Sequence, residues 1–139
     1  MAGEDVRVPI NSDQDIILAR QKGRLLAAEA GFSLVDATLI ATAISELARN
    51  IVSYARSGEI SVQLIQDVSR RGICITAMDA GPGIADIQQA LRDGFSTSGS
   101  LGLGLPGVRR LMDEFLISSA PGEGTVVIAK KWRQDRRIP

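Results

Sequence analysis

The sequence predicts an α+β fold in which helices cover one face of a mostly antiparallel sheet. Its 139 residues, 45% of them apolar, can bury one sizeable core, so we expect a single domain over residues 1–139. Two long segments near the N-terminus have helical apolar spacing, whereas five shorter runs have strand character. The later strands come in adjacent pairs without regular βαβ alternation, which favours a two-layer sandwich.

The first elements expected are a short strand and a long helix. Residues 5–10 (DVRVPI) alternate polar and apolar side chains, and Pro9 suits an edge strand because its missing N–H does least damage there. Residues 11–13 (NSD) offer helix-capping chemistry before a segment of periodic apolar residues. We therefore predict a helix over about 13–30, ended by Gly31.

The strongest periodic signal belongs to a second helix, from about Leu34 to Tyr54, with Ser33 as its cap. Its apolar positions are spaced by four, three and four residues, which places them on one helix face. These positions are Ile40, Ile44, Leu47 and Ile51.

The second half predicts strand pairs separated by helices. Residues 59–68 (EISVQLIQDV) and 72–79 (GICITAMD) are β-type runs joined by SRRG, which has the polar, glycine-ending character of a hairpin connection. The remaining elements expected are a short helix over 84–94, a mobile loop over 94–101, a helix over 103–113, and strands over 115–120 and 125–132 joined by PGEG.

Charge and residue usage exclude several classes of function. Sixteen basic and sixteen acidic residues cancel, so no net field attracts nucleic acid or an anionic membrane. The absence of histidine excludes a Ser-His-Asp triad, a histidine zinc site and phosphotransfer through an imidazole of this chain. The only cysteine, Cys74, fits buried packing. With no secretion signal and no apolar run near ~18 residues, we expect a cytoplasmic protein.

Nine of the fourteen glycines lie between Gly81 and Gly124, yet three common nucleotide-binding folds do not fit them. Residues 102–107 match GxGxxG, but FSTSGS precedes them where a dinucleotide-binding fold needs a strand, and no acidic residue follows at the ribose-binding distance. The chain contains no GxxxxGK[ST], so a P-loop is absent. An ordinary protein kinase needs a longer chain and an HRD-type loop.

Four ordered segments instead resemble the ATP-binding fold of the gyrase, Hsp90, histidine-kinase and MutL (GHKL) superfamily. They are SELARN (45–50), DAGPG (79–83), GLGLPG (102–107) and GEGT (122–125), and the resemblance extends over nearly the whole chain. Within that superfamily, the ISELARN helix and the run DGFSTSGSLGLGLPGVRRLMDEF are similar to the anti-sigma-factor class of serine/threonine kinases. The closest likeness is to the stressosome switch kinases, the RsbT class.

Glu46 and Asn50 are the candidate reacting residues. On an ideal helix they lie about 40° apart, whereas the apolar stripe is centred about 130° from Glu46. The resemblance implies that Asn50 holds Mg²⁺ through its amide oxygen, and that Glu46 accepts the proton of the incoming hydroxyl as general base. The alternative is that Glu46 and Asn50 are exposed polar residues on a helix surface without a functional role.

The glycine-rich segments supply the expected ATP site. A carboxylate at Asp79 can accept a hydrogen bond from the exocyclic amine of adenine, and Gly81 and Gly83 let the base approach the backbone. The resemblance places Thr125 near the adenine. Free amides at the helix start would hold the phosphates. The expected nucleotide contacts are completed by Ile84, Ser98, Ser100, Leu101, Gly102, Leu103 and Gly104.

The sequence differs from some relatives in the positive charge expected near the γ-phosphate. Some relatives carry an arginine in the lid, whereas residues 95–101 (FSTSGSL) contain none. Arg49, Arg109 or Arg110 could substitute only by pointing inward, and we expect each of them to be solvated instead.

The resemblance implies a kinase that uses ATP and Mg²⁺ to phosphorylate STAS-domain partners, a scaffold and an antagonist. After release, it would bind and activate a PP2C-type phosphatase or another output protein. The alternative is a nucleotide-dependent anti-sigma or binding module that acts by sequestration with little catalysis. The basic tail, about residues 130–139, is either a solvated end or a docking segment.

Overall fold

The computed structural model describes residues 5–84, 87–91 and 104–133. Its elements follow the predicted order of strands and helices. They are β1 (Asp5–Ile10), α1 (Asp13–Glu29), α2 (Leu34–Asn50), η1 (Ile51–Ala55), β2 (Gly58–Gln66), β3 (Arg71–Asp79), α3 (Ile87–Ala90), α4 (Gly104–Leu111), β4 (Glu114–Ser119) and β5 (Thr125–Trp132).

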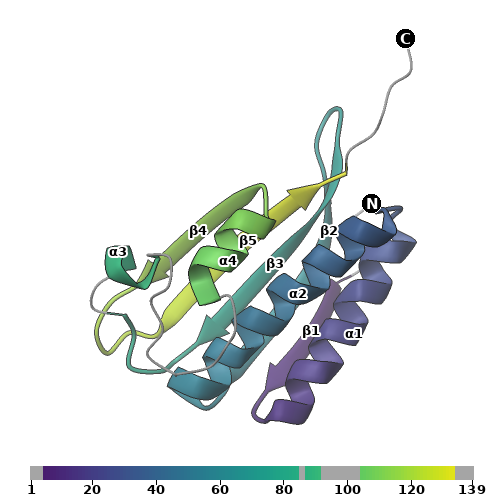
Figure 1. The fold of residues 1–139 in the computed structure, drawn as a ribbon. Coiled ribbons are helices and arrows are strands. Elements are labelled where there is room, and N and C mark those ends of the chain that lie inside the picture. The colour runs from purple at the N-terminus through teal and green to yellow at the C-terminus, as the bar shows by residue number, and fades with distance from the viewer. Residues whose placement is uncertain (1–4, 85–86, 92–103, 134–139) are drawn as a thin grey trace.

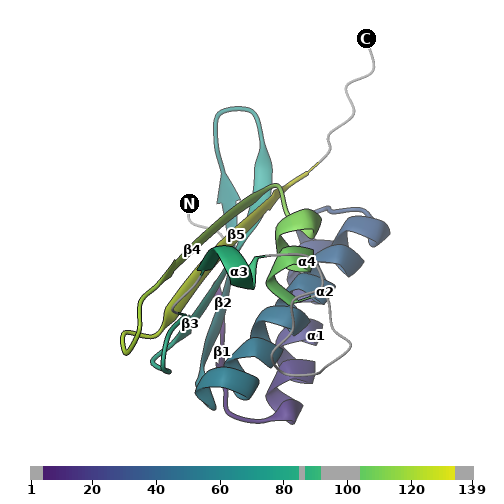
Figure 2. The same cartoon turned by 60° about the vertical axis from the view of Figure 1, so that its left-hand side comes forward.

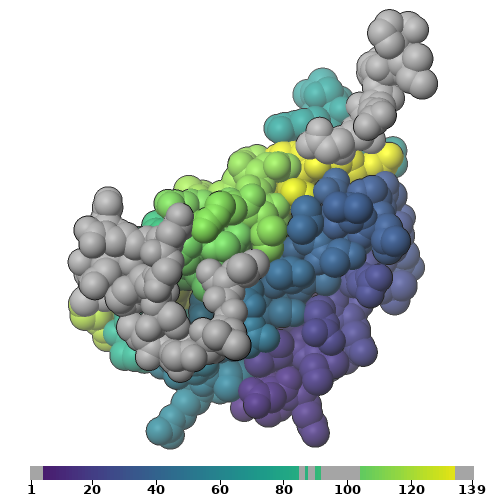
Figure 3. Space-filling model, viewed as in Figure 1, coloured from purple at the N-terminus to yellow at the C-terminus, as the bar shows by residue number. Residues whose placement is uncertain are grey.

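The strands form one five-stranded sheet in the order β1-β2-β3-β5-β4, in which all neighbours are antiparallel. Helices α1, α2 and α4 lie on one face of it (Figures 1 and 2). Helix α2 is in the middle of this layer, in contact with α1 on one side and α4 on the other (Figure 3). The predicted α+β two-layer sandwich is therefore confirmed, and β1 is an edge strand as expected.

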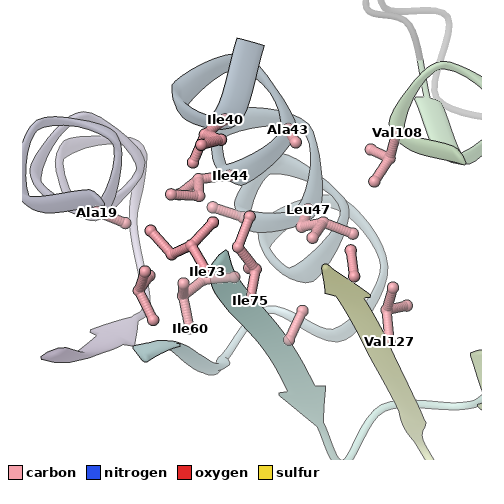
Figure 4. Packing of buried hydrophobic residues seen from close by; sticks show 14 of the residues in the cluster. Ala19, Ile40, Ala43, Ile44, Leu47, Ile60, Ile73, Ile75, Val108 and Val127 are labelled. Atoms are coloured by element: carbon pink, nitrogen blue, oxygen red, sulfur yellow. The ribbon is translucent and has the colours of Figure 1, made fainter. Parts of the chain in front are cut away.

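The core lies between α2 and the central strands (Figure 4). Ile40, Ile44 and Leu47 project from α2 onto Ile73 and Ile75 of β3, and all five are at most 1% exposed. Burying each such side chain stabilises the fold by roughly 1.5–3 kcal/mol, so these contacts hold α2 firmly on the sheet. The apolar spacing of the sequence therefore identified the buried face of this helix.

Helix α1 packs closely on α2 because it carries Gly23 at the crossing. A Cβ atom at Gly23 would stand 2.1 Å from Cδ1 of Ile44. Gly31, with φ +92°, ends α1 as predicted, and the N–H of Phe32 bonds to the carbonyl of Ala27.

The predicted caps have different outcomes. Ser33 caps α2 as expected, since its hydroxyl accepts the N–H of Asp36 at 3.0 Å. Ser12 precedes α1 but makes no capping bond with its side chain. Instead, the carboxylate of Asp15 reaches back and accepts the N–H of Asn11 at 2.8 Å.

The turn between β2 and β3 and the start of the C-terminal tail differ from the predictions. The β2–β3 turn lies at residues 67–70 rather than 69–72, because the Asp67 carboxylate accepts the N–H groups of Ser69 and Arg70. The predicted basic tail began too early, since residues 130–132 belong to β5 and pair with β3.

Helix α2 is shorter than predicted and changes character at its end. The α-helix stops at Asn50, and residues 51–55 form the π-helical turn η1. Arg56 follows with φ 72° and is the only residue other than glycine with positive φ in the described segments. The wider turn leads the chain from the end of α2 into β2, and single π-turns of this kind occur frequently at functional sites.

Candidate functional site

A row of residues crosses one end of the sheet on the side covered by the helices. Asp79 of β3 pairs with Gly58 of β2 and with Thr125 of β5, which in turn pairs with Ser119 of β4. Asp79 and Thr125 each stand two positions from a buried core residue of their strand, Ala77 and Val127 respectively, so their side chains share the core-facing side.

Asp79 is held in a defined orientation. Its Oδ1 accepts the backbone N–H of Gly81 at 2.9 Å, whereas the described residues provide no hydrogen-bond partner for Oδ2. Gly58 lies directly beside it, where a Cβ atom would be 3.1 Å from Cβ of Asp79 and 2.9 Å from Cγ2 of Ile51. Asp79 therefore lies next to the C-terminal end of α2.

The glycines of the DAGPG and GEGT turns pack against the protein's own chain. A Cβ atom at Gly81 would stand 2.6 Å from Cβ of Ala55 in η1. One at Gly83 would meet the carbonyl oxygen of Ala120 at 2.0 Å, and one at Gly124 would meet that of Asp79 at 2.2 Å. These close contacts require glycine at the three positions, and the sequence patterns alone do not reveal this requirement. The contact of Gly81 and Gly83 with adenine stays a prediction.

Ser119 connects these turns and was not identified from the sequence. Its hydroxyl accepts the N–H of Ile84, donates to the carbonyl of Gly124, and bonds to Oγ1 of Thr125, with each distance 2.8 Å. Ile84 and Thr125 were both predicted site residues, and Ser119 brings them together. A serine at the end of a strand has no sequence signal that would have marked it.

Glu46 is the most deeply placed charged residue of the site. Only 7% of it is exposed, so it is not the exposed helix-surface glutamate of the alternative interpretation. Its Oε1 accepts the backbone N–H of Gly104 at 3.0 Å, and its Oε2 forms an ion pair with Arg49. Asn50, one helical turn after Glu46, is half-buried.

Arg49 corrects an expectation, since it is bound to Glu46 rather than solvated. A buried carboxylate needs such partners, because an unpaired charge away from water costs several kcal/mol. Arg109 and Arg110 are exposed on α4, in agreement with the prediction. The Arg109 guanidinium makes a long hydrogen bond of 3.5 Å to the carbonyl of Leu91.

Helix α4 begins at Gly104, whose φ of +65° favours glycine. Leu105 and Val108 bury the helix against the core, so its first amide is fixed beside Glu46. The predicted contacts at Ser98, Ser100, Leu101, Gly102 and Leu103, like the lid over 95–101, lie outside the described residues.

The start of α4 presents a backbone N–H beside Glu46, and Asn50 lies one helical turn after Glu46. A carboxylate oxygen of Glu46 already lies on the first amide of α4, which shows that this amide receives an anionic oxygen. No cluster of three or more His, Cys, Asp or Glu side chains that could hold a metal ion occurs among the described residues. Mg²⁺ at Asn50 would therefore take most of its ligands from phosphate and water, as Mg²⁺ commonly does.

Within the described segments, no helix is both long enough and apolar enough to span a bilayer.

Comparisons with known proteins identify the family of this chain. Residues 35–135 match the family described as histidine kinase-, DNA gyrase B-, and HSP90-like ATPase. Serine/threonine-protein kinase RsbT of Bacillus subtilis is 55% identical over 125 residues, which cover 90% of this chain and 94% of that protein. An anti-sigma F factor of a Thermoanaerobacter species is 29% identical and covers 88% of this chain and 89% of its own.

A solved structure extends the likeness to the fold. The crystal structure of the RsbU and RsbW domains of a Mycobacterium tuberculosis protein superposes with a TM-score of 0.66 at 19% identity. The match covers 98% of this chain and 35% of that longer one. The chain therefore belongs to the histidine kinase-, DNA gyrase B- and HSP90-like ATPase family and, within it, is a serine/threonine-protein kinase of the RsbT class.

Proposed function

We propose that this kinase transfers the γ-phosphoryl group of ATP to a serine or threonine of a STAS-domain partner in a stress-response partner-switching pathway. After release, it would bind and activate a PP2C-type phosphatase or another output protein. The likeness to RsbT and to anti-sigma F factors supports a switch between protein partners. Because the reaction depends on ATP, we expect it to take place in the cytoplasm.

The observation that carries the proposal is the meeting of Glu46 with the start of α4. Glu46 Oε1 lies 3.0 Å from the Gly104 nitrogen, with Asn50 on the same helix one turn away. The proposed base and the first amide of α4 are therefore in direct contact, and the proposed metal-binding residue lies one helical turn from that base.

Each group has a distinct task in the proposed site. ATP would supply the phosphoryl group, and Asn50 would hold Mg²⁺, which would supply positive charge to the phosphates. Asp79 accepts the adenine amine through Oδ2, while Gly81, Gly83, Ile84 and Thr125 surround the base. The backbone amides at Gly102 and Gly104 bind the phosphates, and Ser98, Ser100, Leu101 and Leu103 complete the nucleotide contacts.

Glu46 would take the proton of the substrate hydroxyl as that oxygen bonds to the γ-phosphorus, while the bond from this phosphorus to the β–γ bridging oxygen breaks and ADP leaves. Both carboxylate oxygens already have donors, Gly104 and Arg49. Each carboxylate oxygen can accept more than one hydrogen bond, so Glu46 can accept the hydroxyl without losing either donor. Arg49 remains positioned to hold the carboxylate in place.

The test is transfer from radiolabelled ATP to a purified STAS-domain partner. Glu46→Gln keeps the side-chain size but removes the basic oxygen, so transfer should fall by about 10²–10⁴-fold while ATP binding persists. Glu29→Gln, at the exposed end of α1, is the matched control and should transfer normally. Unchanged transfer by a folded Glu46→Gln protein would disprove the base assignment.

The second candidate is a binding module that sequesters a partner and uses nucleotide only as a conformational ligand. The anti-sigma F factor relatives favour it. Asp79→Asn protein separates the two functions. If partner binding and output persist after ATP binding is lost, sequestration is the primary activity.

A further inference from the structure

Ser119 lies in the predicted base-binding part of the site without being one of the expected contacts. It is half-buried at the end of β4 and occupies the row formed with Asp79 and Thr125. Its three hydrogen bonds involve two segments, the residue after DAGPG and the GEGT turn. This network fixes the direction of the hydrogen bond between Ser119 and Thr125.

The hydrogen atoms of the network can be assigned by counting. A serine hydroxyl has one hydrogen and can accept two hydrogen bonds. The Gly124 carbonyl can only accept, so it takes the Ser119 hydrogen, and the Ile84 N–H can only donate, so it uses one acceptor position. The remaining bond, to Oγ1 of Thr125, must then be donated by Thr125.

Thr125 is consequently left without a hydrogen for any ligand. Its hydroxyl proton is committed to Ser119, and only oxygen lone pairs face outward. Asp79 Oδ2, on the neighbouring strand in direct register with Thr125, is also an acceptor when ionised. Thr125 Oγ1 and Asp79 Oδ2 therefore both present hydrogen-bond acceptors to a ligand.

We propose that Ser119 is a positioning residue that sets base selectivity, because it fixes Thr125 as a hydrogen-bond acceptor facing the purine. The inference rests on the proposed binding of adenine beside Asp79 and Thr125. A base with an exocyclic amine donates to these acceptors, whereas a base with a carbonyl oxygen at the same place meets lone pairs. The site then selects a 6-amino purine over a 6-oxo purine.

Removing the Ser119 hydroxyl releases Thr125 from this restriction. In Ser119→Ala, the Thr125 hydroxyl can rotate and donate to a carbonyl oxygen, so the 6-oxo purine is no longer refused by this group. The preference for the 6-amino purine over the 6-oxo purine should therefore fall, while the part of it that comes from Asp79 persists. A role limited to tying the turns together would weaken every nucleotide equally, because it would not distinguish the two purines.

The experiment compares the dissociation constants of MgATP and MgITP for the full chain, by calorimetry. Inosine differs from adenosine only at this edge of the base. We expect the ratio of the ITP constant to the ATP constant to fall about tenfold in Ser119→Ala. Ser119→Thr, which keeps a hydroxyl, should restore the ratio. Ser118→Ala, at the exposed neighbouring position, is the matched control and should leave it unchanged.

A second variant keeps the test decisive if Ser119→Ala folds poorly. Thr125→Val leaves the bonds of Ser119 to Ile84 and Gly124 intact and should also lower the ratio. In the double variant, Ser119→Ala should add nothing further, because its effect acts through Thr125.

The outcomes separate this inference from the proposed function. An unchanged ratio in both Ser119→Ala and Thr125→Val would overturn the role of Ser119. If Asp79→Asn still weakens ATP binding in that case, the nucleotide site stands and only the selectivity inference falls. Failure of the wild-type chain to bind ATP would overturn both.

Discussion

The carboxylate of Glu46 accepts a hydrogen bond from the backbone N–H of Gly104, 58 residues later in the chain. This bond joins the centre of α2 to the first residue of α4. The same carboxylate pairs with Arg49, so a single buried side chain connects a helix, a helix start and a guanidinium. A substitution that changes the partners of Glu46 should therefore affect both the stability of the fold and the proposed proton transfer.

Arg49→Ala should destabilise the fold by about 1–2 kcal/mol, because it removes one partner of a carboxylate whose side chain is only 10% exposed. The Arg49 side chain is itself 39% exposed, which keeps the loss moderate. Urea unfolding would measure the loss. In a Glu46→Gln background, the same substitution should cost less, and equal costs in both backgrounds would contradict an energetic coupling between the two residues.

Two glycines with nearly the same φ should respond differently to alanine. Gly122 (φ +78°) has no atom within 4 Å of a built Cβ, so Gly122→Ala should cost only the conformational strain, about 1–2 kcal/mol. Gly124 (φ +77°) would in addition place a Cβ atom 2.2 Å from the carbonyl oxygen of Asp79. Thermal unfolding should show a clearly larger loss for Gly124→Ala, and equal losses would argue against the close packing of the two turns.

Arg56→Gly should leave stability unchanged or raise it by about 1 kcal/mol. Arg56 has φ 72° and ψ −38°, a conformation that glycine adopts more easily than other residues. Denaturant midpoints of Arg56→Gly and Arg56→Ala provide the comparison. A greater stability of the alanine variant would show that the backbone there is not strained.

Burial raises the pKa of the Cys74 thiol, so the folded state disfavours the thiolate. The unfolded chain releases this proton first, and stability should therefore decline as pH rises from the ordinary thiol pKa towards the folded value. Alkylation of the native protein near pH 8 should be slower than that of the urea-unfolded chain. Cys74→Ala should lack this part of the pH dependence, and an identical pH profile for both proteins would refute it.

Local patterns explain why much of the fold could be predicted. The spacing of Ile40, Ile44 and Leu47 identified the buried face of α2, because a helix that covers a sheet must be apolar on that side. Turn residues located the strand pairs. The hairpin turn was misplaced by two residues because the side chain of Asp67, rather than a glycine, closes it.

The candidate site was only partly predictable, because its remaining contacts join distant segments. Motif order identified Glu46 and Asp79, but not the bond from Glu46 to Gly104 or the ion pair with Arg49. Periodicity placed Arg49 on a solvated surface, since it does not include the need of a buried carboxylate for a partner. Ser119 escaped detection because its partners meet only when β4 and β5 are paired.

The position of β5 has a consequence for the order in which the protein is completed during synthesis. This strand is later in the chain than the other four, yet it lies between β3 and β4 in the sheet. A nascent chain that has not reached Thr125 lacks the strand that joins β3 to β4, and Asp79 then has no neighbour on that side. We therefore expect nucleotide binding at the proposed site beside Asp79 to require β5, so that a chain truncated before Thr125 should not bind ATP.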